Sequence, residues 1–328
     1  MDFTLKTYRQ LITTLQQQGF VFQTFQEYLE SYQELASPLV PVPSHREDKG
    51  ASAGKDKQKT ITLRHDVDLL PHNSLRFAQI QYEMGIKGSY YFRAVPESWN
   101  ESIIQEIAAL GHEIGYHYEC LTTTKGNMQA GIADFEQNLA ALRKLAPVKT
   151  ICMHGSPRSK WDSKALWKNY NYRDYGIIGE PYFDINFDEV FYLTDTGRRW
   201  DGWKVSLRDK VPQQEQWKEQ GLVFHSTQDI IRRVEGLGDD EKLRRGDEEA
   251  KGRGDKGTRR LGDKGTRKQE NTETGGQRDL EKEMGTVKFP DKVMFTFHPQ
   301  RWHSSYYLWL KELIFQNAKN QVKRFLVK

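Results

Sequence analysis

Two aspartates, Asp66 and Asp68, stand two residues apart where a predicted strand over 61–63 ends. Side chains two apart in a strand project to the same side. Two carboxylates that close repel each other unless a cation or a shared proton relieves the repulsion. The pair therefore predicts a metal site, an acid/base site, or both. Arg64 and His65, immediately before the pair, are candidate partners that orient the carboxylates.

Four further groups of polar and aromatic side chains fall at predicted strand ends, at 111–119, 154–157, 198–202 and 298–302. Each residue has a structural alternative: a lone histidine can be a hydrogen-bonded core residue, and a tryptophan commonly packs. Several such groups together favour one shared site, because the strand ends of an α/β barrel converge on one mouth. The groups add the candidates His112, His117, Glu119, His154, Arg198, Arg199, Trp200, His298, Arg301 and Trp302.

The elements that would position these residues follow a strand–helix alternation. Repeated strand–helix units predict a mostly parallel sheet with right-handed crossovers. The N-terminal segment, 1–37, predicts two helices and a short strand that pack on this unit. We expect strands at 61–63, 89–92, 113–116, 150–153, 176–178, 190–193, 222–224 and 293–297, and helices at 74–84, 101–110, 128–145, 227–234 and 306–327.

Two hyperpolar stretches interrupt this pattern, a connector at 38–60 and a long charged stretch at 235–288. The second contains a tandem Gly-Asp-Lys-Gly-Thr-Arg unit with a period of eight, starting at 254 and 262. Such a sequence cannot bury a core, which predicts a disordered low-complexity insertion before the last strand. The barrel-forming part would then be 61–234 together with 289–328.

Composition excludes several classes of protein. The 49 basic and 45 acidic residues are interspersed and give a net charge of only +4, which argues against a nucleic-acid-binding surface. The two cysteines, Cys120 and Cys152, do not make a disulfide framework. No apolar run approaches a membrane span, and the first residues do not resemble a signal peptide. We therefore expect a soluble, cytoplasmic enzyme.

Residues 61–302 resemble the polysaccharide deacetylase superfamily, also called NodB-homology or carbohydrate esterase 4. The resemblance rests on the acidic pair Asp66 and Asp68, on Gly-His-Glu-Ile-Gly-x-His at 111–117, and on a late strand that ends in His298. It implies an α/β fold of the distorted (β/α)7 TIM-like barrel type, and a divalent metal, usually zinc, that helps to remove acetyl groups from N-acetylated sugars. It further implies Asp66 as general base, Asp68 and His117 as metal ligands, and His298 as general acid.

The chain departs from the family pattern at the third ligand. Leu121 stands where the family usually has a histidine, so Asp68 and His117 need a further partner. Glu119 or His154 would supply it, and His154 preserves the usual ligand set. Arg198 or Arg199 could tune Asp66 or hold an anionic part of the substrate.

Three functions follow from these features. The first is a metal-dependent deacetylase that acts on a carbohydrate precursor in surface polysaccharide biosynthesis. The second is a glycosyltransferase in which Asp66-Val67-Asp68 serves as an Asp-x-Asp motif, although this leaves the run at 111–117 unexplained. The third is a carbohydrate-binding barrel without hydrolytic activity.

Overall fold

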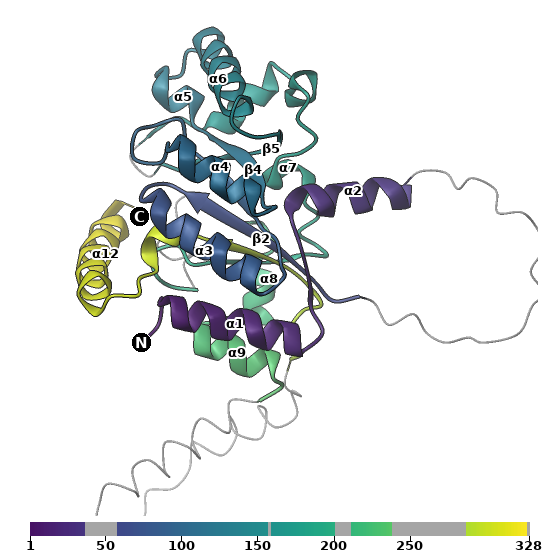
Figure 1. Ribbon diagram of the computed structural model, residues 1–328, viewed down its shortest axis with the longest axis vertical. Coiled ribbons are helices and arrows are strands. Elements are labelled where there is room, and N and C mark those ends of the chain that lie inside the picture. Colours follow the sequence, from purple (N-terminus) through teal and green to yellow (C-terminus); the bar gives the residue numbers. More distant parts are fainter. Residues whose placement is uncertain (37–57, 157–158, 201–210, 238–286, 327–328) are drawn as a thin grey trace, which may run out of the picture.

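The computed structural model describes residues 1–36, 58–156, 159–200, 211–237 and 287–326 (Figure 1). Most of the predicted connector 38–60 and of the predicted insertion 235–288 lies outside these residues, as does the end of the candidate group 198–202. The described residues form an α/β fold in which helices flank a central sheet of seven strands. This arrangement is compatible with a barrel-like fold.

All strand pairs in this sheet are parallel, as the strand–helix alternation predicts. The hydrogen-bonded order is β5-β4-β3-β2-β7-β6, and β1 pairs with the beginning of β2. The carboxyl ends of these strands therefore lie at one edge of the sheet. The strands are β1 (Val21–Gln23), β2 (Thr60–Val67), β3 (Ser89–Phe92), β4 (Glu113–Tyr118), β5 (Val148–Met153), β6 (Phe191–Thr194) and β7 (Lys292–Phe297).

The helices begin where the sequence offers capping side chains. Asn100 and Asn127 cap two of them, and Ser226 forms a capping box with Asp229 at a third. The α-helices are α1 (Leu5–Gln17), α2 (Phe25–Ala36), α3 (Pro71–Glu83), α4 (Glu101–Ala109), α5 (Cys120–Thr123), α6 (Met128–Arg143), α7 (Pro181–Asp184), α8 (Gln214–Glu219), α9 (Thr227–Val234) and α12 (Tyr306–Leu326). The 3₁₀ turns are η1 (Ser163–Lys168), η2 (Tyr172–Tyr175) and η4 (Pro299–Arg301).

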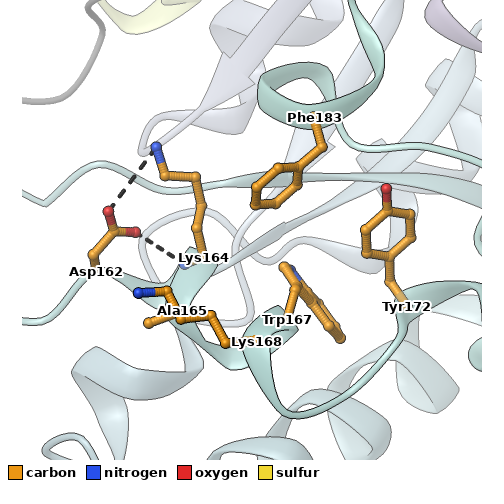
Figure 2. A pocket seen from close by; sticks show the side chains of 7 residues that line it. All are labelled: Asp162, Lys164, Ala165, Trp167, Lys168, Tyr172 and Phe183. Atoms are coloured by element: carbon orange, nitrogen blue, oxygen red, sulfur yellow. Dashed lines mark hydrogen bonds and ion pairs between the residues drawn. The ribbon is translucent and has the colours of Figure 1, made fainter.

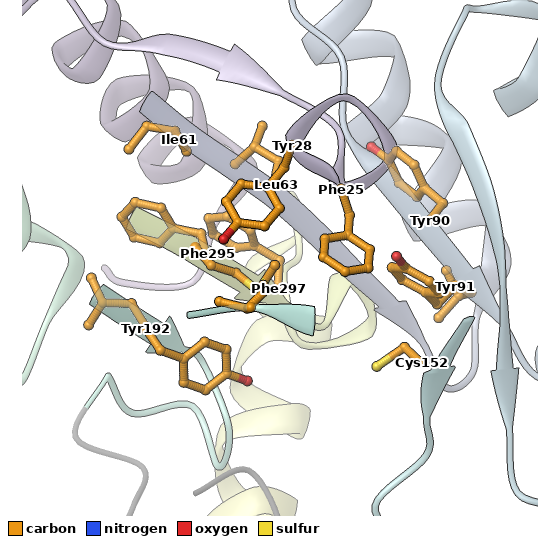
Figure 3. Packing of buried hydrophobic residues seen from close by; sticks show 14 of the residues in the cluster. Phe25, Tyr28, Ile61, Leu63, Tyr90, Tyr91, Cys152, Tyr192, Phe295 and Phe297 are labelled. Atoms are coloured by element: carbon orange, nitrogen blue, oxygen red, sulfur yellow. The ribbon is translucent and has the colours of Figure 1, made fainter. Parts of the chain in front are cut away.

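The two faces of β2 carry different chemistry. Ile61 and Leu63 are fully buried among aromatic side chains of neighbouring strands, including Tyr90 and Phe297 (Figure 3). Because side chains alternate along a strand, Arg64 and Asp66 point to the other side. One face of β2 thus builds the core, and the other presents charged groups.

Two of the predicted strands are not named strands in the structure. The run 222–224 pairs with no strand among the described residues, and Phe224 is buried in a loop instead, edge-on to Phe191 and Phe289. A short apolar run can be buried by side-chain packing alone, so its composition does not distinguish a strand from a buried loop. The run 176–178 leads to a single parallel bridge between Gly179 and Thr150 of β5.

The last helix, α12, docks through Trp309, whose indole N–H donates to the carbonyl oxygen of Asp2 at 2.5 Å. Several large apolar side chains on α12 remain exposed, among them Tyr307 and Ile314. No helix in the described part of the chain is long and apolar enough to span a membrane.

Candidate metal centre

Three of the predicted ligands, Asp68, His117 and His154, lie together at the carboxyl edge of the sheet. Their ligand atoms all lie within 4.8 Å of one another. Nε2 of His117 and Nε2 of His154 are each 3.5 Å from Oδ1 of Asp68. Metal–ligand bonds of about 2.0–2.1 Å in a tetrahedron place ligand atoms about 3.3 Å apart, so this spacing suits zinc or a similar ion.

Hydrogen bonds behind the two imidazoles direct their Nε2 atoms to the cluster. Nδ1 of His117 lies 2.9 Å from the carbonyl oxygen of Cys152, and Nδ1 of His154 lies 2.9 Å from Oε2 of Glu119. An Nδ1–H that donates to an oxygen leaves the lone pair on Nε2, which is the usual arrangement of metal-binding histidines.

One carboxylate oxygen in the cluster is an orphan. Oδ1 of Asp68 is buried and accepts no hydrogen bond, whereas Oδ2 accepts one from Nε2 of Gln300 at 3.0 Å. Burial raises the pKa of Asp68, but the neighbouring His117, His154 and His298 in their protonated forms lower it further, so that without a metal the net pKa lies well below its usual range. A buried, ionised oxygen without a donor fits a cation-binding role.

Glu119, the other candidate for the third ligand, stands behind His154 rather than in the cluster. Its Oε1 pairs with the guanidinium of Arg93 at 2.6 Å while Oε2 accepts from His154. Since both oxygens have partners within the protein, Glu119 orients His154. The structure therefore corrects its assignment from a ligand to a partner of one.

Asp66 lies beside the cluster in a buried ion pair with Arg64. The guanidinium Nε and Nη2 donate to Oδ1 and Oδ2 of Asp66 at 2.8 and 2.6 Å. Burial raises the pKa of Asp66, but the attraction of Arg64 and His117 outweighs it and lowers the net pKa. Oδ2 of Asp66 is also 3.7 Å from Nε2 of His117. The arginine that tunes Asp66 is thus Arg64.

His298 faces the cluster from the end of β7, with Nε2 4.0 Å from Oδ2 of Asp68. Its Nδ1 lies 2.6 Å from Oδ1 of Asp195, and its backbone N–H donates to Oδ2 of Asp195 at 2.9 Å. Burial and Arg301 lower the pKa of His298, but Asp195 and Asp68 raise it, and the net pKa lies above its usual value. The structure therefore favours a protonated imidazole here.

Arg301 and Trp302 lie behind His298, not on an open substrate surface. Both donate to Asp195, Arg301 through Nη1 at 2.9 Å and Trp302 through its indole nitrogen at 2.6 Å. Trp302 is 1% exposed. Arg301 and Trp302 thus fix the Asp195 carboxylate, which in turn orients the His298 ring.

His65 and His112, expected near the carboxylates, belong to the core. His65 bonds to the carbonyl of Ser89 and to the amide of Gln81, and burial lowers its pKa to about 3. His112 links Gly88 N–H to the carbonyl of Ala78, and burial lowers its pKa to about 4. The expectation that they contact substrate or orient ligands is wrong. The strand alternation that directs Asp66 inward directs His65 away from it.

Arg198 and Trp200 also pack away from the cluster. The Arg198 guanidinium stacks over the rings of Phe3 and Trp309, and Trp200 packs edge-on to Phe297. Asp66 accepts from Arg64 rather than from Arg198, so the predicted role of Arg198 in tuning Asp66 is wrong. The role of Arg199, and that of either arginine in holding an anionic part of the substrate, stays a prediction.

Residues that the sequence reasoning missed are Asp195, Gln300 and Arg93. Asp195 directly follows β6 and Arg93 directly follows β3. The strand-end rule that found Asp68 and His154 would have found both. Gln300 lies within the group at 298–302, and its amide N–H donates to Oδ2 of Asp68.

Comparison with known proteins adds no relative, since no family model, curated protein or solved structure matches this chain.

Proposed function

We propose that this protein is a metal-dependent hydrolase that removes an acetyl group from an N-acetylated sugar, on a distorted (β/α)7 barrel. The observation that carries the proposal is the buried cluster of Asp68, His117 and His154. Its orphan carboxylate oxygen and its two directed imidazoles fit a divalent metal such as zinc. Asp66 and His298 flank this cluster.

The chemistry required is the attack of water on an amide carbonyl and the protonation of a departing amine. A divalent metal, when bound, makes its water more acidic and polarises the carbonyl. Asp66 accepts the proton of the attacking water. The Arg64 pair keeps its carboxylate ionised and fixed in one orientation, which is what a positioned base requires.

His298 then protonates the amine nitrogen. Asp195 fixes the tautomer by accepting from Nδ1, so that the transferable proton sits on Nε2, the atom that faces the cluster. Asp195 and Asp68 raise the pKa of His298, which favours the protonated form that a general acid requires. Asp66 and His298 thus lie beside the same metal-ligand cluster, where Asp66 accepts a proton and His298 donates one.

The test combines metal content with acetate release. Purified wild-type protein offered zinc should retain a near-stoichiometric amount, and His117→Ala and His154→Ala should lose it, because each removes a ligand. Lys6→Gln, an exposed change on α1, is the matched control. Asp66→Asn should keep the metal and abolish acetate release from chitin oligosaccharides or from nucleotide-linked N-acetylglucosamine.

Two results would overturn the proposal. Absence of bound zinc in the wild type would favour a carbohydrate-binding barrel without hydrolysis. Zinc retention with no acetate release from any substrate would count equally against it. The glycosyltransferase alternative is not favoured, because an Asp-x-Asp motif does not account for His117 and His154 beside Asp68.

A further inference from the structure

A cavity of about 490 Å³ opens between η1 and α7, outside the candidate metal centre (Figure 2). Its volume falls within the range of pockets that hold small-molecule ligands, about 300–1,000 Å³. None of the residues considered above as ligand, base or acid lines it. Its walls are Asp162, Lys164, Ala165, Trp167, Lys168, Tyr172 and Phe183.

Aromatic rings form opposite sides of this cavity. Phe183 points from α7 toward Trp167 on η1, and 50% of its surface is exposed (Figure 2). Trp167 is held in place by its indole N–H, which donates to the hydroxyl of Tyr118 at 2.8 Å. Tyr172 packs edge-on to Trp167 with ring centroids 5.4 Å apart. Phe183 lies nearly parallel to Tyr172, with ring centroids 6.3 Å apart, so the rings of Trp167 and Phe183 are steeply inclined to each other. The half-exposed ring of Phe183 therefore suits a flat ligand that stacks on it beside Trp167.

Two ammonium groups lie on the same turn as Trp167. Lys168 is exposed, and Nζ of Lys164 lies 4.4 Å above the ring of Tyr182. Oδ1 of Asp162 accepts the backbone N–H of Lys164 at 2.9 Å, whereas Oδ2 is 3.9 Å from the Lys164 ammonium, a long distance for an ion pair. Asp162 therefore acts mainly as the cap of η1, and the lining keeps an excess positive charge.

Tyr182 connects this cavity to the candidate site. The Arg64 guanidinium lies 5.5 Å from the same Tyr182 ring that Lys164 covers, and Arg64 holds Asp66. The backbone offers a second connection, because buried Glu180 accepts from the N–H groups of Met153 and Tyr182. Met153 immediately precedes His154. The Tyr182 ring thus lies between a ligand bound at Lys164 and the Arg64–Asp66 ion pair.

We propose that this cavity binds the nucleoside diphosphate part of a nucleotide-linked sugar, with the base against Phe183 and the phosphates at Lys164 and Lys168. A planar base needs apolar faces, and phosphates need cations. A bare, uncharged glycan would leave the excess positive charge of the lining without a partner. That the attached sugar is the one deacetylated rests on the proposed function.

The experiment measures binding of uridine diphosphate by calorimetry, with a metal chelator present throughout. Phe183→Ala and Lys164→Gln should each weaken binding about tenfold or more, as the loss of a stacking contact or of a charged phosphate partner would. Tyr82→Ala, another exposed aromatic, and Lys6→Gln, another exposed lysine, should leave binding unchanged. Circular dichroism confirms that each variant is folded.

Absence of binding to the wild type, or equal binding by all variants, overturns the proposal. Binding that appears only when Mn²⁺ replaces the chelator, and is lost in Asp68→Asn, also overturns it and points to the Asp-x-Asp reading. Because the chelated assay needs no metal and no turnover, it separates this proposal from the proposed function. Acetate release from chitin oligosaccharides without binding of uridine diphosphate would leave the hydrolase intact and remove the nucleotide site.

Discussion

Arg64 and Asp66 form an ion pair that is almost wholly withdrawn from water, with side chains 1% and 3% exposed. Removing one member of such a pair leaves an uncompensated buried charge, which costs about 3–5 kcal/mol. Arg64→Met should therefore destabilise the protein by about that amount in urea unfolding. The double variant Arg64→Met with Asp66→Asn should recover part of the loss, because the orphaned charge is gone. Equal stability of Arg64→Met and wild type would show that the pair is not buried in solution.

The buried neutral histidines make stability depend on pH. The pKa of His112 in the folded protein is about 4, below the unfolded value of about 6.5. The unfolded chain therefore binds a proton first, and stability falls as pH drops from about 6.5 toward 4. His112→Gln, which keeps a donor and an acceptor, should reduce the loss between pH 8 and pH 5 by about 2 kcal/mol. Urea unfolding at both pH values measures this, and an unchanged loss would refute it.

Among the elements, β4 shows what a motif can and cannot predict. The run at 111–117 carries the resemblance to the deacetylases as one motif, but of its residues only His117 belongs to the metal-ligand cluster. His112 and Glu113 hold elements together instead. Periodicity predicted the strand, and the strand-end rule predicted its location. The run did not show which side each residue would face, because that depends on where β4 begins relative to β3 and β5.

Glu113 joins four elements through one buried carboxylate. Its Oε2 accepts from the backbone N–H of Gln26 at 3.0 Å and from the hydroxyl of Ser89 at 2.5 Å, and its Oε1 accepts from the hydroxyl of Thr150. Glu113→Ala leaves these donors without an acceptor, at a cost of about 1–3 kcal/mol for each one that water does not reach. Urea unfolding should show a loss of several kcal/mol, and the exposed change Glu101→Ala on α4 should show almost none. A loss no larger than that control would mean that α2 is not held through Glu113.

At the scale of the whole molecule, the sequence predicted the parallel sheet and the meeting of Asp68, His117 and His154, because both follow from strand order and strand ends. The sequence analysis did not predict the residues that orient these ligands and His298. Asp195 and Arg93 also follow strands, but their partners, His298 and Glu119, become evident only from the side-chain contacts of the folded protein. Trp200 and Trp302 were misplaced for a related reason, since a strand-end tryptophan can pack inward or face the mouth.

The insertion supplies the last prediction, because the residues on both sides of it lie close together. Nη1 of Arg233, near the end of α9, donates to the carbonyl of Val287 at 3.2 Å. A short Gly-Ser linker in place of 238–286 can therefore join the two sides without moving β7. Closure entropy changes by about 0.6 kcal/mol for each doubling of loop length, so a roughly eightfold shorter loop should raise stability by about 1–2 kcal/mol. The shortened protein should also bind as much zinc as the wild type does, since every residue of the candidate centre lies outside the replaced segment. Lower stability or loss of zinc in the shortened protein would show that 238–286 contribute to the fold or to the metal centre.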